Sequence, residues 1–214
     1  IIAVGALLEY VLPSPRKFSH PFFDYIDPIA VSLFSMMTGV GFIVFSASGY
    51  VFAPPLVPTT LFGYIIIGVQ AFIGLGLGLG VFVQTLSLAL IVIYLLSAFC
   101  FGIQNMMKTL EIPGIAFMLL LSVRSHWVLF SSEWLEVIVK NFREYGVPLL
   151  RVFAGFNLIV IGFSEKILHP ELGLAFLSIY HWNFMQMLGF QNFTDYWFVL
   201  SAGVVQVLFG LVFI

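Results

Sequence analysis

One end of an apolar segment carries three neighbouring side chains that could take part in chemistry. The segment LLRVFAGFNLIVIGFSEKILHPEL, residues 149 to 172, contains Glu165, Lys166 and His169 near its end. Glu165 and His169 stand at i and i+4, so they share a face if an α-helix continues to Pro170. A carboxylate, an ammonium group and an imidazole together can donate and accept hydrogen bonds. We take these three residues as a candidate site for a ligand or a partner subunit.

A second interpretation of the same charges stays open. Arg151 precedes Lys166 by 15 residues, which corresponds to about 22 Å along a helix, so the two cannot share a ligand directly. Each side chain can instead extend to its own membrane interface, with the stem among lipids and the charge among head groups. In that case the charges only mark the two ends of one membrane span.

Three further polar residues fall within apolar runs. Arg124 and His126 interrupt MLLLSVRSHWVLF, and Gln206 lies in the last apolar run. A charge inside a span is costly and indicates function by default, unless the span ends near Arg124 and the side chain reaches the head groups. His126 and His181 are the only candidates for intramembrane haem ligands. Since nothing in their spacing pairs them, we expect satisfied or interfacial histidines.

The sequence contains no recognisable catalytic or metal-binding set. Its one cysteine, Cys100, excludes an intrachain disulfide and a CxxC pair. Neither a Ser-His-Asp set, nor HExxH, nor a carboxylate cluster is visible. We therefore expect no metal site, no certain cofactor and no catalysis by this chain alone.

The composition is that of a membrane protein. Of the 214 residues, 61% are hydrophobic and only 8% are charged, whereas soluble domains keep about a quarter of their residues charged. A net charge of -2 offers no basic face for phosphates, so nucleic acid is not an expected partner. Membrane lipids are.

The apolar runs predict an all-α integral membrane protein, a bundle of about six transmembrane helices with the first and last truncated. Proline and glycine separate the runs. The full spans are expected at 29–53, 60–79, 82–103, 112–130 and 147–168, with the end of a helix at 1–12, an interfacial segment at 172–189 and a last helix from Trp197.

An internal repeat indicates how the bundle is organised. Residues 33–56 align without gaps with residues 149–172, and seven of the 24 positions are identical. In the next helix of each copy, Gln70 and Gly74 correspond to Gln206 and Gly210, which lie 136 residues later. A parallel duplication of a four-helix unit, with the second unit interrupted, accounts for both matches.

The repeat divides the chain into three parts. Residues 1–28 are expected to form the end of a preceding helix and a polar linker. The first four-helix unit covers 29–145 and includes an interfacial amphipathic helix near 131–145, and the first half of the second unit covers 146–214. The run GLGLGLG places small residues at helix-packing spacing, at Gly74, Gly76, Gly78 and Gly80.

The second copy resembles a known family. It contains R-x3-G-x6-G-x3-K from Arg151 to Lys166, then HPEL, then Gln206-x3-Gly210. This succession is similar to the first half of a DoxX-like unit, a four-helix membrane family to which the DoxD subunit of archaeal thiosulfate:quinone oxidoreductase is related. The resemblance implies a quinone as a possible cofactor. Gln206 stands where such proteins tend to carry an acidic residue, and the first copy lacks the Arg and the Lys.

Three functions follow as alternatives. The first is a structural or anchoring subunit of a larger, energy-transducing complex with other membrane subunits as partners, in a prokaryotic inner membrane. The second, implied by the resemblance and by the region of Lys166, is the membrane subunit of a quinone-linked oxidoreductase. The third is a small-molecule or ion transporter, which rests on the parallel repeat and on Arg124.

Overall fold

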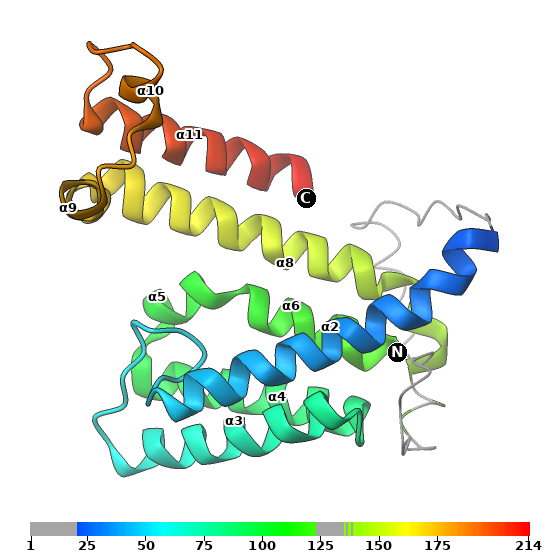
Figure 1. The fold of residues 1–214 in the computed structure, drawn as a ribbon. Coiled ribbons are helices and arrows are strands. Elements are labelled where there is room, and N and C mark those ends of the chain that lie inside the picture. Colours follow the sequence, from blue (N-terminus) through cyan, green and yellow to red (C-terminus); the bar gives the residue numbers. More distant parts are fainter. Residues whose placement is uncertain (1–20, 123–134, 136, 138) are drawn as a thin grey trace. The chain divides into compact units, whose positions relative to one another are not determined.

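The protein is an all-α bundle. The computed structural model describes residues 21–122, 135, 137 and 139–214, and this part of the chain forms helices and no strand. Five of the helices are long and apolar enough to cross a membrane. The predicted fold class, an integral membrane protein made of helices, is thereby confirmed, and Figure 1 shows the arrangement of the elements. The expected helix at 1–12 lies outside the described residues.

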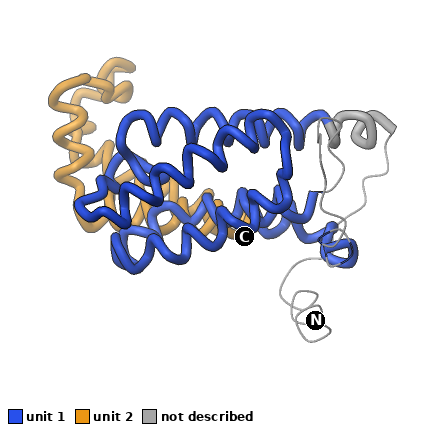
Figure 2. The backbone as a smooth tube through the Cα atoms, turned by 90° about the horizontal axis from the view of Figure 1, so that it is seen from below, with its two compact units in different colours: residues 1–150 blue, residues 151–214 orange. Residues whose placement is uncertain are grey.

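The chain divides into two compact units between Leu150 and Arg151, coloured separately in Figure 2. In the first unit, α2 packs against α3, α3 packs against α4, and α4 packs against α6. Its elements are α2 (Pro21–Ala47), α3 (Leu61–Leu79), α4 (Val83–Phe101), α5 (Ile103–Met106), the 3-10 turn η1 (Met107–Thr109), α6 (Glu111–Leu121) and the 3-10 turn η2 (Lys140–Tyr145).

The second unit is a helical hairpin with a folded connection. Its first helix continues without a break into a π-helical segment, and its last helix returns alongside that segment. Its elements are α8 (Gly146–Ile161), which begins before the division, the π-helical segment η3 (Gly162–Leu168), α9 (Pro170–Tyr180), α10 (Phe184–Met187) and α11 (Asp195–Phe213). The predicted start of the second unit, residue 146, is where α8 begins.

The division of residues 60–103 into two spans near Gly80 is confirmed. Gly80 has φ 69°, and its N–H reaches the carbonyls of Gly76 and Leu77. This left-handed conformation closes α3 without the steric cost that a Cβ would bring. A turn through Phe82 then leads directly into α4.

Three other predicted boundaries differ. The span expected at 29–53 ends at Ala47 because Gly49, at φ 81°, turns the chain before Pro54 is reached. The same helix begins at Pro21, inside the stretch that we assigned to a linker. The helix α6 ends at Leu121, and the rest of the span expected at 112–130 lies outside the described residues.

The predicted amphipathic helix near 131–145 lies partly outside the described residues. Within its described part, Leu135 and Val139 are helical and buried, whereas Val137 is exposed. Val139 packs with Leu120 and Leu121 of α6. The end of the stretch forms η2, a tighter turn than the α-helix expected.

A buried amide fixes the loop between α2 and α3. The side chain of Gln70 is fully buried, and its Oε1 accepts a hydrogen bond from the N–H of Phe52 at 2.9 Å. Its Nε2 donates to Ser46 Oγ at 3.0 Å and lies within 3.4 Å of the carbonyl oxygens of Phe42 and Tyr50. Because backbone groups in an apolar interior must find a partner, Gln70 permits residues 48–60 to fold back onto the hairpin.

Replacing Gln70 by leucine should destabilise the fold. The variant Gln70→Leu leaves the N–H of Phe52 buried without its acceptor, which costs about 1–3 kcal/mol. The free energy of unfolding, measured by denaturant titration in detergent, should fall by that amount. The exposed Gln191, which makes one hydrogen bond to the Gln186 carbonyl, serves as the control, and Gln191→Leu should change stability by less than about 0.5 kcal/mol. Equal effects of the two variants would contradict this role of Gln70.

Glycine lets α2 and α3 touch through their backbones. A Cβ on Gly74 would lie 2.9 Å from the carbonyl oxygen of Gly39, and a Cβ on Gly39 would collide with the backbone of Gly74 and Gly78. Gly76 faces Leu86 of α4 at a similarly close approach. Of the four glycines expected to pack helices, Gly80 instead ends α3, and a Cβ on Gly78 would meet no atom within 4 Å.

A methyl group on Gly74 should therefore destabilise the protein where one on Gly68 does not. Gly68 lies in the same helix, and a Cβ there would meet nothing within 4 Å. Alanine raises helix propensity equally at both positions, so the difference between them reports the contact alone. Gly74→Ala should be less stable than Gly68→Ala by about 1–3 kcal/mol, as overpacking typically costs. Denaturant titration of the two variants measures this difference.

Candidate functional site

Lys166 and Gln206 form a direct polar contact between two helices of the second unit. Lys166 Nζ donates to Gln206 Oε1 at 2.6 Å, and the pair is partly buried. Lys166 lies in the π-helical segment η3 and Gln206 lies in α11. A wider π-helical turn is a frequent feature of functional sites. The contact joins two residues that the sequence singled out for separate reasons.

Two glycines make room for this contact. A Cβ on Gly203 would lie 2.8 Å from Lys166 Cβ, and a Cβ on Gly162 would lie 3.1 Å from the carbonyl oxygen of Gly203. The stem of Lys166 therefore crosses α11 directly over Gly203. A larger residue at that position would push the lysine away from Gln206.

The α-helix that would bring Glu165 and His169 to one face does not continue to Pro170. The segment is π-helical and ends at Leu168, since His169 has φ −125° and ψ 63°. The α-helical geometry on which we based the shared face of Glu165 and His169 is therefore absent. His169 Nδ1 lies 2.9 Å from Glu171 Oε1 instead, and both side chains are exposed.

Glu171 opens α9 and has a lowered pKa. Its own backbone N–H hydrogen-bonds the carboxylate, which is the main cause, and His169 adds a second hydrogen bond. Both interactions favour the ionised form, so the pKa of Glu171 lies below its ordinary value of 4.5. Sequence reasoning missed this residue, although an acidic side chain directly after a helix-opening proline favours an N-terminal role.

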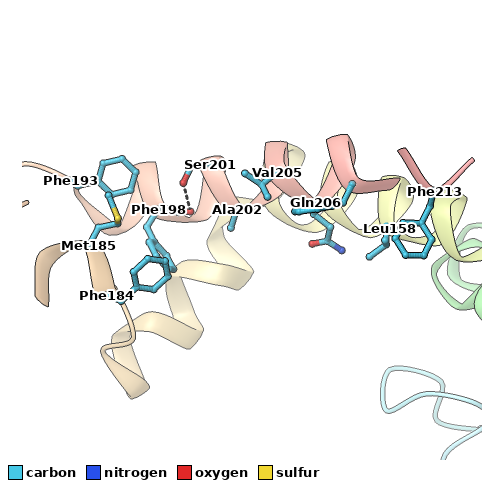
Figure 3. Close-up of a pocket in the computed structure, with 11 residues that line it drawn as sticks. Leu158, Phe184, Met185, Phe193, Phe198, Ser201, Ala202, Val205, Gln206 and Phe213 are labelled. Carbon is cyan, nitrogen blue, oxygen red and sulfur yellow. Dashed lines mark hydrogen bonds between the residues drawn. The ribbon is translucent and has the colours of Figure 1, made fainter. Parts of the chain in front are cut away.

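An open apolar groove of about 680 Å³ lies next to Gln206. Figure 3 shows Gln206 in the middle of the groove, with aromatic rings at both ends. Ser201 also lines the groove, but its Oγ donates to the Phe198 carbonyl at 2.9 Å. The other lining residues are Leu158, Phe184, Met185, Phe193, Phe198, Ala202, Val205, Phe209 and Phe213. The groove thus presents one amide in an otherwise apolar surface.

The connection between α9 and α11 is held by a second amide. Asn183 is buried, and its Nδ2 donates to Asp195 Oδ1 at 2.8 Å and to the Phe193 carbonyl at 3.0 Å. This connection carries Phe184 and Phe193 to one end of the groove. Its aromatic character predicted an interfacial segment at 172–189. In the structure, α9 and α10 form within this stretch.

The other candidate residues lie elsewhere. Arg124 and His126 lie outside the described residues. Arg151 is exposed on α8, and exposed His181 caps α9 with φ 50°. Cys100 is exposed. The described part of the chain contains no group of three His, Cys, Asp or Glu side chains able to hold a metal ion.

Comparison with protein families, with curated proteins and with solved structures finds no match. The resemblance to the DoxX-like family therefore remains a prediction from the sequence.

The contact between Lys166 and Gln206 should couple the two residues energetically. A hydrogen bond to a charged group contributes about 1.5–3 kcal/mol. In a double-mutant cycle of Lys166→Met and Gln206→Leu, the effects on unfolding free energy should be non-additive by that amount. Additive effects would show that the contact contributes nothing to stability.

Glu171 should titrate below pH 4.5, the ordinary value for a glutamate. A carboxylate with a depressed pKa in the fold stabilises it above that ordinary value, and the contribution disappears as the pH falls through the folded pKa. NMR titration of the Glu171 carboxyl carbon measures the pKa. Replacing His169 by alanine should raise it only part of the way, because the Glu171 N–H remains. Full recovery in His169→Ala would identify the imidazole as the main cause.

Proposed function

We propose that the chain is a structural subunit of a larger membrane assembly, to which its second unit contributes a helix-packing surface. The observation that carries this proposal is the groove beside Gln206. Ile73 and Leu77 of α3 are buried, whereas Phe209 and Phe213, the residues aligned with them, line the groove. A prokaryotic inner membrane and an energy-transducing complex fit the resemblance to the DoxX-like family.

The last helix of the second unit is also less buried than α3 and α4 of the first unit, which is consistent with a surface that packs against other helices. Of the window of α11 that could cross a membrane, 17% is buried, against 33% for α3 and 39% for α4. Lipids alone can cover such a surface. An aromatic, glycine-containing surface with one amide is also typical of helices that pack with other helices in a membrane.

A quinone-linked oxidoreductase subunit is the second candidate. Gln206 places an amide in an apolar groove whose volume of about 680 Å³ falls within the range of small-molecule sites, and the Lys166 ammonium group contacts that amide from outside the groove lining. The two carbonyl oxygens of a quinone head group accept hydrogen bonds from such donors. The transporter hypothesis rests on the parallel repeat and on Arg124, which lies outside the described residues, and stays a prediction.

Extraction of the native membrane with a polymer that retains lipid tests the assembly. If the chain is a structural subunit, native mass spectrometry should find it in particles with at least one other membrane polypeptide at a fixed ratio. A particle that contains only the polypeptide to which this sequence belongs, alone or with copies of itself, would contradict the proposal.

Quinone content of the same particles tests the second candidate. Wild-type particles should release quinone on organic extraction, and Lys166→Met should reduce the amount severalfold while the subunit composition stays unchanged. Arg151→Met is the matched control, because Arg151 is an exposed cation on α8, whereas Lys166 contacts the groove residue Gln206. Equal quinone content in all three preparations would exclude a quinone site at Lys166.

A further inference from the structure

The first unit contains a small pocket beside the turn that joins α3 to α4. It has a volume of about 50 Å³ and is lined by residues from α2, from the end of α3 and from the start of α4. The backbone of Gly78, which belongs to this lining, borders open space, because a Cβ there would meet no atom within 4 Å. Side chains of the three helices therefore leave a gap at this point.

Two serine hydroxyl groups make the α2 wall of this pocket polar. Ser32 and Ser35 are each 3% exposed, and they stand at i and i+3, on one face of α2. The Ser35 hydroxyl donates to the Leu77 carbonyl at 3.0 Å. A hydroxyl oxygen that donates its proton still has two lone pairs that accept hydrogen bonds. The α2 wall therefore favours a ligand that donates hydrogen bonds.

The end of α3 brings further acceptors to the same pocket. The last four carbonyl groups of a helix have no partner within it, and in α3 these belong to residues 76–79. The first two accept hydrogen bonds from the N–H groups of the turn and from Ser35. The other two belong to Gly78 and Leu79, which line the pocket. The negative end of the helix dipole lies here too, so this wall also favours a donor.

We propose that this pocket is a binding site for ordered water. One water molecule needs about 10–15 Å³ of such a cavity, so a volume of about 50 Å³ has room for roughly three. A lipid head group or an organic ligand needs several times more space. An apolar gap stays dry, whereas water in a polar one bonds to its walls. This inference does not depend on the proposed function.

The position of the pocket lets water reach it. Leu79 is the last residue of one candidate membrane span and Val83 is the first residue of the next, so the pocket lies where two spans end and the bilayer meets water. Among its lining side chains, Met36 and Leu79 are 41% and 68% exposed, whereas both serines are buried. The bound water links α2 to the α3–α4 turn through hydrogen bonds that are nearly as favourable as direct ones.

Oxidation of two neighbouring methionines by hydroxyl radicals tests the proposal. An X-ray pulse generates these radicals from water, including bound water, and they oxidise methionine to its sulfoxide. Met36 lines the pocket, whereas Met37 is outside the lining and is 75% exposed. In lipid nanodiscs, Met36 should be oxidised severalfold faster than Met37, although Met37 is the more exposed. Tandem mass spectrometry of the peptide that contains both residues measures the two rates.

A variant that fills the pocket identifies the water that reacts. The side chain of Gly78→Val should occupy the space beside the serines and displace the water, so the rate at Met36 should fall to that at Met37. Gly68→Val is the matched control in the same helix, because a Cβ on Gly68 also meets no atom within 4 Å and Gly68 lies outside the pocket lining. This control should leave both rates unchanged.

Two results would overturn the inference. If Met36 is oxidised no faster than Met37 in the unmodified chain, the pocket is dry. If Gly78→Val folds and Met36 keeps its rate, the reacting water lies elsewhere. Should Gly78→Val unfold at a lower denaturant concentration than Gly68→Val, the comparison is made between Gly78→Ala and Gly68→Ala, and the smaller methyl group should still lower the rate at Met36 alone. Neither result depends on whether the chain belongs to an assembly.

Discussion

The contact between helix backbones at paired glycines is the constraint on which both hairpins depend. Lipid tails are as apolar as leucine, so burying apolar area gives little driving force between helices in a membrane. Close packing must supply the attraction, and dispersion energy falls steeply with separation. Gly39 with Gly74 and Gly155 with Gly210 bring the backbones together at one point of each hairpin. The remaining contacts follow from where that point lies.

A glutamine four residues before the glycine of α3 and of α11 then determines what the connection of each hairpin binds. Gln70 binds backbone groups and so brings the connecting loop into the core, where Phe52 packs on Tyr94 with ring centroids 5.7 Å apart. Gln206 binds the Lys166 side chain instead. The connection after η3 is longer and forms helices of its own. One amide at one position thus supports a closed end in the first unit and a groove in the second.

Much of the fold could be predicted from the sequence, because apolar length and helix-breaking residues act locally. The α3 and α4 spans and the turn at Gly80 depend on residues within a few positions of one another. The early end of α2 could not be predicted from local residues alone, since the chain turns at Gly49 and the loop that follows is held by the Gln70 amide of another helix. The π-helical turn of η3 could not be predicted either, and it sets the direction in which the Lys166 side chain leaves the helix. The sequence pointed to Lys166 and Gln206 separately, but their contact could not be predicted because they lie 40 positions apart. The groove could not be predicted from the sequence, because it is defined by the exposure of side chains in the folded second unit.

The three-residue turn between α3 and α4, residues 80–82, also has a consequence for biosynthesis. Three extended residues reach about 10 Å at most, which is far less than the roughly 30 Å thickness of the hydrocarbon core. The end of α3 and the start of α4 must therefore emerge on the same side of the bilayer. The two helices cannot enter it independently with a soluble segment translocated between them. During synthesis they have to partition into the lipid as one helical hairpin, so the orientation of either helix decides that of the other.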